Sequence, residues 1–370
     1  MVALIVILQD AYGHNVTVVL PYEGNGKELL DEYGIRNFLI PSYTWTTPIE
    51  GMNKPIRVLK DTVKAAITKK NAGQIEALIR ANDIDIVHNN TSWGYIGALA
   101  ALETQTPLVW HIQEFLEEDQ ARTIRWQKRG YALMAKSDMA LAISESIYDK
   151  YAPIIGEDKL ELVLDGIDAH KYECADHEIL TGNKVRFLLV GGGEGKGHPV
   201  AIKACLRLLE RGYDDFELVL LGNVGGAYRE RLHALYVDVP GAAEHFVFPG
   251  PTDDTPAYYA ATDIFLMCSR AEAFGRVTVE AMMGGCLAIG ANTAGTKELI
   301  EDGVTGYLFE ANNPDDLARK IEHALEHKEQ SRALAKEGQA YMLQNMTAEA
   351  NAAKVNQIYG EILLKRAAHE

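Results

Sequence analysis

The sequence has no apolar run long enough to cross a membrane. Its longest one, residues 2–8, is far shorter than the roughly 20 residues that a bilayer requires, and it lacks the basic flank and the cleavage site of a signal peptide. Cysteine is scarce as well, because the 370 residues include only four, scattered without metal-ligand spacing. The sequence therefore argues against a disulfide framework and a zinc site, and we expect a cytoplasmic protein.

Positive charge is also in short supply. The formal net charge is -16, and no clustered basic face of the kind that binds nucleic acid is evident. Nucleic acid is therefore excluded as a partner. A chain of 370 residues exceeds the usual size of a single hydrophobic core, so two domains are expected.

Short apolar, β-branched runs alternate with longer amphipathic stretches from residue 15 onward. Ten strands are expected, at NVTVVLP, IDIVHNN, PLVWHI, DMALAIS, LELVLDG, VRFLLVGG, FELVLLG, HFVFPG, DIFLMCS and CLAIG. Such runs are typical of parallel strands covered by helices on both faces, so the fold class is α/β with βαβ units.

The alternation stops at residues 168–185, a polar stretch rich in turn formers, where we place the linker. The sequence thus predicts two Rossmann-like domains with parallel sheets facing across a cleft, at residues 1–167 and 168–347. A final helix, residues 348–366, is expected to pack back on the first domain. Ligands of such sheets bind beyond the carboxyl ends of the strands.

A glycine-rich loop, VGGGEGKG, follows the sixth expected strand and precedes a helix. Free backbone N–H groups and a helix N-terminus suit a phosphate, and Lys196 would add a full positive charge. A simple flexible turn is the alternative. A P-loop is rejected because Gly197 and His198 follow the lysine.

The stretch SRAEAFGRVTVEAMM follows the strand DIFLMCS and carries Glu272 in a loop and Glu280 in the next helix. A carboxylate there can accept hydrogen bonds from the two hydroxyls of a ribose. Each glutamate could instead be stabilised only by the helix dipole. Their position on either side of Phe274 and Gly275, where a backbone can approach a ligand closely, favours binding.

This segment resembles the Glu-x7-Glu signature of the family 4 retaining glycosyltransferases, which have the GT-B fold. YGHNVTVVLP, IDIVHNNTSWGYIGALAA, PLVWHIQEF, VLDGID, VGGGEGKG and TAGTKELIEDGVTGYLF also resemble segments of that family, in the family's order. The resemblance extends over nearly the whole chain. It implies transfer of a sugar from a nucleotide-diphosphate sugar, with UDP preferred over GDP-mannose, and without a metal ion or another cofactor.

The resemblance also implies roles for individual residues. Glu280 would hold the ribose, Glu272 a sugar hydroxyl, and Lys196 the leaving diphosphate, whereas His111 would lie near the donor sugar. The remaining donor-binding positions would be the glycine loop and the amides before the helix: Gly191, Gly192, Phe274, Gly275 and Arg276. A glycosidase-like carboxylate pair is the competing mechanism, but a diphosphate leaving group needs no acid catalyst.

Three departures from the family pattern stand out. Gly192 occupies about the place of an arginine, and Asp165 that of an asparagine. The family's first strand and its loop are expected to be absent, because residues 1–12 correspond to the following helix; VALIVILQ resembles a strand by composition, but we favour the helix. We therefore expect a chain that binds nucleotide sugar better than it transfers it.

Other functions and partners remain open from the sequence. A nucleotide-sugar 2-epimerase or an inert binding protein would share the fold. The acceptor is expected to be a glycan or a lipid-linked molecule, as in polysaccharide biosynthesis. Basic residues at near-helical spacing, Lys54, Arg57, Lys60 and Lys64, indicate either peripheral contact with the inner membrane face or a solvated helix face.

Overall fold

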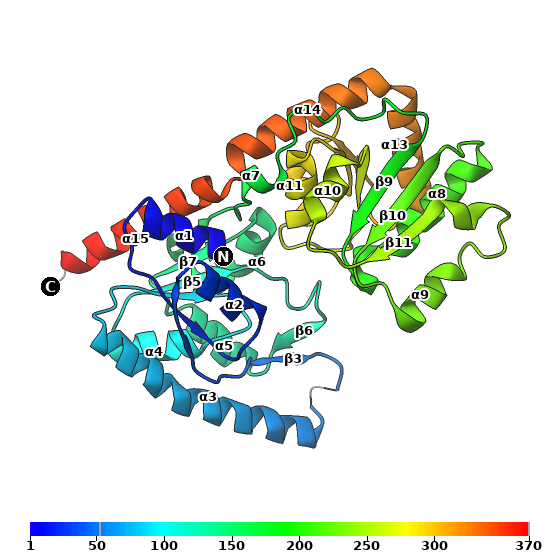
Figure 1. Cartoon of the computed structure of the whole chain (residues 1–370). Helices are drawn as coiled ribbons and strands as arrows, with labels where there is room; N and C mark the ends of the chain where they lie inside the picture. The colour runs from blue at the N-terminus through cyan, green and yellow to red at the C-terminus, as the bar shows by residue number, and fades with distance from the viewer. Residues whose placement is uncertain (52, 369–370) are drawn as a thin grey trace. The chain divides into compact units, whose positions relative to one another are not determined.

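The computed structural model describes residues 1–51 and 53–368 and divides into two compact units (Figure 1). Unit 1 comprises Met1–Gly166 together with Ala348–Glu370, and unit 2 comprises Ile167–Thr347. All ten expected strands are present, and each pairs in parallel with a neighbour.

The sheet of unit 2 has six parallel strands in the spatial order β11-β10-β9-β12-β13-β14. The strands are β9 (Val185–Val190), β10 (Phe216–Leu221), β11 (Phe246–Gly250), β12 (Ile264–Met267), β13 (Leu287–Ala291) and β14 (Tyr307–Phe309). The helices are α7 (Ala169–Tyr172), α8 (His198–Glu210), α9 (Gly226–His233), α10 (Thr255–Ala260), α11 (Arg276–Met283), α12 (Thr296–Leu299), α13 (Pro314–Glu326) and α14 (Lys328–Asn345).

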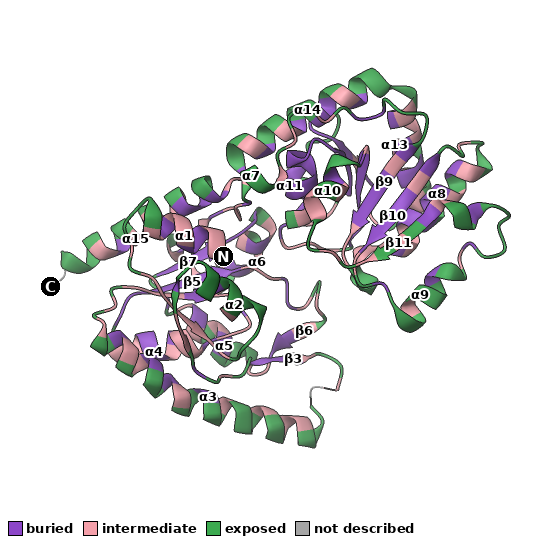
Figure 2. Cartoon of the chain, viewed as in Figure 1, coloured by how far each residue is buried: buried purple, intermediate pink, exposed green. Residues whose placement is uncertain are grey.

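Helices cover both faces of this sheet, which explains its continuous apolar strands. Phe187 and Leu189 of β9 pack in a cluster with residues of α8 and α13, whereas Leu188 between them packs with residues of α10 and α11. Figure 2 shows the strands buried and the outer sides of the helices exposed. Apolar side chains are therefore required on both faces of the central strands β9, β10, β12 and β13.

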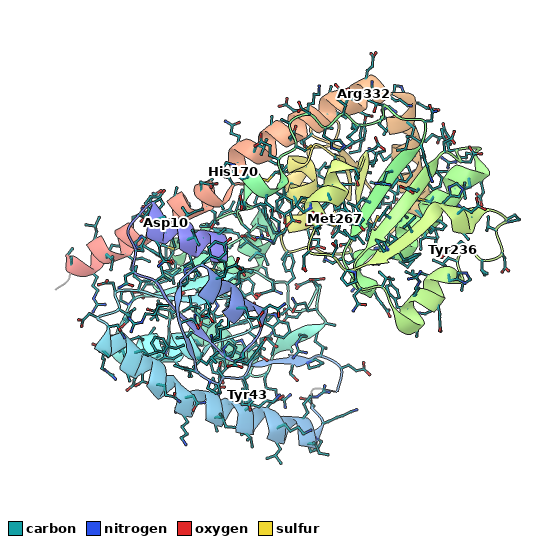
Figure 3. The ribbon with its side chains drawn as sticks, viewed as in Figure 1. Asp10, Tyr43, His170, Tyr236, Met267 and Arg332 are labelled. Carbon is teal, nitrogen blue, oxygen red and sulfur yellow. The ribbon has the colours of Figure 1, made fainter. Side chains whose placement is uncertain are left out.

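The strand order reverses between β9 and β12. From β9 the chain proceeds outward to β10 and β11, then returns to place β12 on the other side of β9. Met267, the last residue of β12, marks this carboxyl edge of the sheet (Figure 3). In doubly wound sheets, ligands bind at this reversal.

Unit 1 contains three smaller sheets: a parallel one in the order β4-β5-β7-β8, the parallel pair β1-β2 and the antiparallel pair β3-β6. The strands are β1 (Thr17–Leu20), β2 (Arg36–Leu39), β3 (Thr46–Pro48), β4 (Val87–Asn90), β5 (Leu108–Ile112), β6 (Arg122–Ile124), β7 (Met139–Ala142) and β8 (Leu160–Leu162). Among the described residues, no strand pairs with both the β1-β2 pair and the sheet that contains β4.

Unit 1 has seven helices in the described part of the chain, and α1 and α15 are the first and the last of them. They are α1 (Val2–Asp10), α2 (Asn25–Glu32), α3 (Pro55–Ala81), α4 (Ile96–Thr104), α5 (Gln127–Met134), α6 (Glu145–Ile155) and α15 (Ala348–Ala367). The helical interpretation of VALIVILQ is confirmed. Leu4 and Leu8 pack with Val355 of α15, and Ile5 belongs to the cluster around β1. Within the described ranges, no helix is both long and apolar enough to traverse a bilayer.

The stretch interpreted as a linker, residues 168–185, is instead packed on unit 2. The Asp263 carboxylate accepts hydrogen bonds from the backbone N–H groups of Leu180 and Arg186. The guanidinium of Arg332 donates to the carbonyl oxygens of Ile179 and Leu180, both of which belong to a buried cluster. Side chains remote in sequence thus hold a segment whose own composition resembles a loop.

Candidate functional site

Two loops meet at the strand reversal of unit 2. One follows β9 and runs from residue 191 to Gly197, and the other follows β12 and runs from residue 268 to 275. The N–H of Arg270 donates to the carbonyl of Gly195 at 3.4 Å. A Cβ atom at Gly197, which has φ of +73°, would lie 2.0 Å from the carbonyl oxygen of Cys268. Only glycine allows the loops to approach so closely.

The contact between these loops pairs two predicted site residues. Nζ of Lys196 lies 2.5 Å from Oε1 of Glu272. The two side chains are 29% and 12% exposed, so the pair is largely shielded from water without being sealed off. The residue predicted to bind the diphosphate therefore contacts the residue predicted to bind the sugar.

Glu280, the other glutamate of the motif, lies inside α11 and is buried, with 8% of its surface exposed. Its Oε2 accepts a hydrogen bond from the Tyr259 hydroxyl of α10 at 3.0 Å. The ring of Tyr172 from α7 packs edge-on against Tyr259. Burial raises the pKa of Glu280 above its ordinary value, an effect that the Tyr259 hydrogen bond opposes.

The N-terminus of α11 faces the same loop. Gly275 precedes the helix with φ of +99°. Within the described residues, the backbone N–H groups of Ala273, Phe274 and Gly275 have no hydrogen-bond acceptor. The Phe274 side chain is buried, so only its backbone is available to a ligand. Unpaired N–H groups at a helix N-terminus form an anion site.

The glycine loop after β9 leaves no room for a side chain at Gly192 and little room at Gly191. A Cβ atom at Gly192 would lie 2.6 Å from the carbonyl oxygen of Asn223. At Gly191, where φ is +124°, it would lie 3.0 Å from Cε of Lys196. Because the backbone of Asn223 occupies this space, the arginine expected near Gly192 could not be restored by substitution alone.

His111 belongs to unit 1 and lies near the carboxyl end of β5. It is 1% exposed, and burial lowers its pKa to about 3. Its Nδ1 lies 3.2 Å from Nε2 of His88, whereas its own Nε2 is buried and has no hydrogen-bond partner among the described residues. Its role as a donor-sugar contact stays a prediction, as do the roles of the unit 2 residues.

Sequence reasoning missed several buried polar groups around the two loops. Ser269, Thr278 and Thr296 carry buried hydroxyls that have no partner among the described residues. His198, at the start of α8, has a buried Nε2 without a partner, and burial lowers its pKa to about 4. No sequence signal distinguishes these residues from ordinary loop and helix-start positions, because only their burial is unusual.

A hollow of about 340 Å³ lies elsewhere in unit 2, between residues 177–181 and α14. Three of its polar side chains already make hydrogen bonds: His177 bonds to the carbonyl of Gly284, Arg332 to the 168–185 stretch, and Gln339 to two backbone carbonyls. None of the predicted site residues lines it. We therefore interpret it as structural.

Two family models match the chain in succession. Residues 8–171 match the model described as Glycosyltransferase Family 4, and residues 173–341 match the model described as Glycosyl transferases group 1. The chain belongs to the group 1, family 4 glycosyltransferases. The boundary between the two matches falls in α7, shortly after unit 2 begins.

Curated relatives of the chain include a GDP-mannose-dependent alpha-(1-6)-phosphatidylinositol monomannoside mannosyltransferase of Mycobacterium tuberculosis. It is 30% identical over 169 residues, which are 43% of this chain and 43% of the relative, so the match spans less than half of that protein. D-inositol 3-phosphate glycosyltransferase 1 of Catenulispora acidiphila is 25% identical over 293 residues, covering 72% of this chain and 69% of that protein.

Solved glycosyltransferase structures share the fold. A glycosyltransferase of Rickettsia africae has a TM-score of 0.80 at 20% identity, covering 98% of this chain and 94% of its own. HepE of Anabaena, solved in complex with UDP and glucose, has a TM-score of 0.77 at 20% identity, covering 97% and 95%. The predicted GT-B fold is therefore confirmed.

Proposed function

We propose that the chain transfers a sugar from a nucleotide-diphosphate sugar to a glycan or lipid-linked acceptor, with retention at the anomeric carbon and without a metal ion. The observation that carries this proposal is the convergence of three features at the strand reversal of unit 2. These are the paired Lys196 and Glu272, the unpaired amides before α11, and the buried carboxylate of Glu280. UDP is the preferred nucleotide, and polysaccharide biosynthesis is the expected process.

The site suits a reaction in which negative charge develops on a leaving diphosphate. In this mechanism the bond between the anomeric carbon and the phosphate oxygen breaks while the acceptor oxygen attacks from the same face. The acceptor proton passes to the departing phosphate. Lys196 and the amides at residues 273–275 would stabilise the developing charge without rearranging, in place of a metal ion. Glu272, whose negative charge is balanced by the ion pair with Lys196, would bind a sugar hydroxyl and would not act as a nucleophile.

A thermal-shift screen of UDP-, GDP- and ADP-sugars tests the binding part of this proposal. A UDP-sugar is expected to raise the melting temperature, because a ligand that binds only the folded state stabilises it by mass action. The product anomer, read by NMR after incubation with acceptor, tests retention. Absence of a shift with every nucleotide would exclude a donor site, and an inverted product would exclude the same-face mechanism.

Competing functions predict other results. A 2-epimerase would interconvert the nucleotide sugar without any acceptor, and an inert binding protein would show a thermal shift without turnover. The two matched family models are both glycosyltransferases, which favours transfer over epimerisation.

We further propose that the protein works in the cytoplasm, with helix α3 lying on an anionic membrane face. Four apolar side chains at i, i+3, i+7 and i+11 form one stripe on α3 that is exposed to solvent. They are Ile56, Leu59, Val63 and Ile67, with exposures of 71%, 66%, 50% and 37%. An apolar stripe on a surface helix is typical of helices that lie in a membrane interface.

The charge around this stripe supports a lipid partner over a second copy of the chain. Residues 54–70 carry six basic side chains and one acidic one, Asp61, which pairs with Arg125, whereas the whole chain has a net charge of -16. Tyr43 lies beside α3 (Figure 3), and Nζ of Lys64 lies over its ring. Basic residues next to an apolar stripe attract anionic lipid but would repel each other between two copies.

Vesicle co-sedimentation tests this surface. Wild-type protein is expected to bind phosphatidylglycerol vesicles at low salt and phosphatidylcholine vesicles much less. The Ile56→Ser/Leu59→Ser variant should bind about tenfold more weakly or worse. Burial of one such apolar side chain contributes roughly 1.5–3 kcal/mol of binding free energy, and each substitution removes that contribution.

Leu364→Ser, at an equally exposed leucine of α15 with 73% exposure, is the matched control and should bind as wild type does. Equal binding to both vesicle types, or a dimer that the double variant abolishes, would overturn the membrane assignment.

A further inference from the structure

Three side chains of unit 1 form a line from the C-terminal helix to the predicted donor-sugar histidine. The Tyr359 hydroxyl of α15 lies 2.6 Å from Nδ1 of His88 on β4. Nε2 of His88 lies 3.2 Å from Nδ1 of His111 on β5. The line ends at Nε2 of His111, which is buried and has no partner among the described residues. Neither Tyr359 nor His88 has a role in the mechanism above.

The line can be assigned proton by proton, starting at Tyr359. Its hydroxyl has one proton to donate, and Nδ1 of His88 is its only hydrogen-bond partner in the described part of the chain. Burial raises the pKa of Tyr359 above its ordinary value, so the phenol stays protonated at neutral pH. We take the hydroxyl as the donor and Nδ1 of His88 as the acceptor, because in the reverse direction the phenolic proton would have no hydrogen-bond partner among the described residues.

The assignment continues through the two imidazoles, which are both neutral. Burial lowers the pKa of each to about 3, and the nearby His111 lowers that of His88 further. A neutral imidazole carries one proton, so one ring nitrogen donates and the other accepts. Because Nδ1 of His88 accepts, its Nε2–H donates to Nδ1 of His111. The proton of His111 is consequently on Nε2.

We infer that Tyr359 and His88 are positioning residues that hold His111 as the Nε2–H tautomer, so that it presents a neutral N–H donor to an acceptor oxygen of the bound sugar nucleotide. This inference rests on the proposed function for the identity of the ligand, but its tautomer part rests only on the hydrogen-bond geometry of unit 1 and the direction assigned at Tyr359. A buried N–H without an acceptor is costly, and a ligand oxygen that accepts from it removes that cost. A charged histidine, or the other tautomer, would not present the same group.

The proposal makes the sugar the expected recipient of this hydrogen bond. A neutral donor suits a neutral hydroxyl oxygen, whereas a charged phosphate oxygen binds a cationic donor more strongly. Loss of the hydrogen bonds that connect Tyr359, His88 and His111 should therefore weaken binding of a nucleotide sugar and leave binding of the bare nucleoside diphosphate unchanged.

Long-range proton–nitrogen NMR spectra of histidine-labelled full-length protein at pH 7 test the tautomers without any ligand. We expect both His88 and His111 to carry the proton on Nε2 in the wild type. Tyr359→Phe removes the phenolic proton, so the ratio of tautomers at both histidines should shift toward Nδ1–H by about fivefold or more. Tyr131→Phe, which removes a hydroxyl in contact with Gln127, is the control and should leave both unchanged.

Two results would overturn the inference. One is a wild-type His111 protonated on Nδ1 or on both nitrogens, and the other is a Tyr359→Phe spectrum identical to that of the wild type. In a parallel titration, Tyr359→Phe should bind UDP-glucose about fivefold more weakly and UDP equally well. If the tautomers shift as expected but no nucleotide binds to either protein, the proposed function fails while the proton assignment stands.

Discussion

Replacing Glu280 with alanine is expected to weaken nucleotide-sugar binding by about 100-fold or more. The Glu280 carboxylate is buried and uses one oxygen to accept from Tyr259, which leaves acceptor capacity for two ribose hydroxyls. A hydrogen bond to a charged group contributes about 1.5–3 kcal/mol, and this variant would lose two of them. Isothermal titration with UDP and with UDP-glucose measures the effect, which should be the same for both ligands because the ribose is common to them.

Tyr259→Phe is the matched control for Glu280→Ala. It removes the hydroxyl that donates to Glu280 but keeps the carboxylate, so binding should change by no more than about fivefold. Glu280→Gln keeps the shape of the side chain without its charge and should fall between the two. A wild-type affinity in Glu280→Ala would show that the ribose is not held at this position.

Replacing Lys196 with alanine is expected to lower kcat by roughly 100- to 1000-fold, the range found when one preorganised charge-stabilising group is removed. The reason is that Lys196 would act mainly as charge develops on the departing diphosphate, since in the free protein it is already paired with Glu272. Ground-state binding of the donor should change by less than about tenfold. Steady-state rates of transfer, or of donor hydrolysis when no acceptor is present, give the split between kcat and KM.

Two variants control for the loss of charge in Lys196→Ala. Lys203→Ala removes an exposed lysine of α8 in the same unit and should leave kcat unchanged. Lys196→Arg keeps the positive charge with altered geometry and should retain part of the rate. A Lys196→Ala enzyme with wild-type kcat and a raised KM would assign this lysine to binding alone.

The strands of both units could be predicted because their local pattern carries the information. The FLLV within VRFLLV and the IFLM within DIFLMCS are apolar at every position, and a strand buried on both faces requires that pattern. The short strands β2, β3, β6 and β14 were not predicted. Each of these strands has only three or four residues and lies at the edge of a sheet or in a two-stranded sheet, so its sequence shows no long continuous apolar run.

Contacts between remote segments could not be predicted from local pattern. Residues 168–185 resemble a linker by composition, yet the Asp263 carboxylate and the Arg332 guanidinium hold them on unit 2. Hydrogen bonds of this kind depend on where distant side chains lie. The same is true of the hydroxyls of Ser269 and Thr296, which became site candidates only through their burial.

The sequence by itself determined that this is an α/β protein with glycine-rich and glutamate-bearing loops after its strands, because the period of apolar residues reports local burial. The tertiary structure alone decided which loops meet. Lys196 and Glu272 are 76 positions apart, and they pair because β12 lies beside β9 at the strand reversal. Tyr359 reaches His88 across 271 positions because α15 packs on the sheet of unit 1. The apolar strands have similar local sequence patterns, so the pattern does not specify which strands pair. The pairing is determined only by packing of the whole domain.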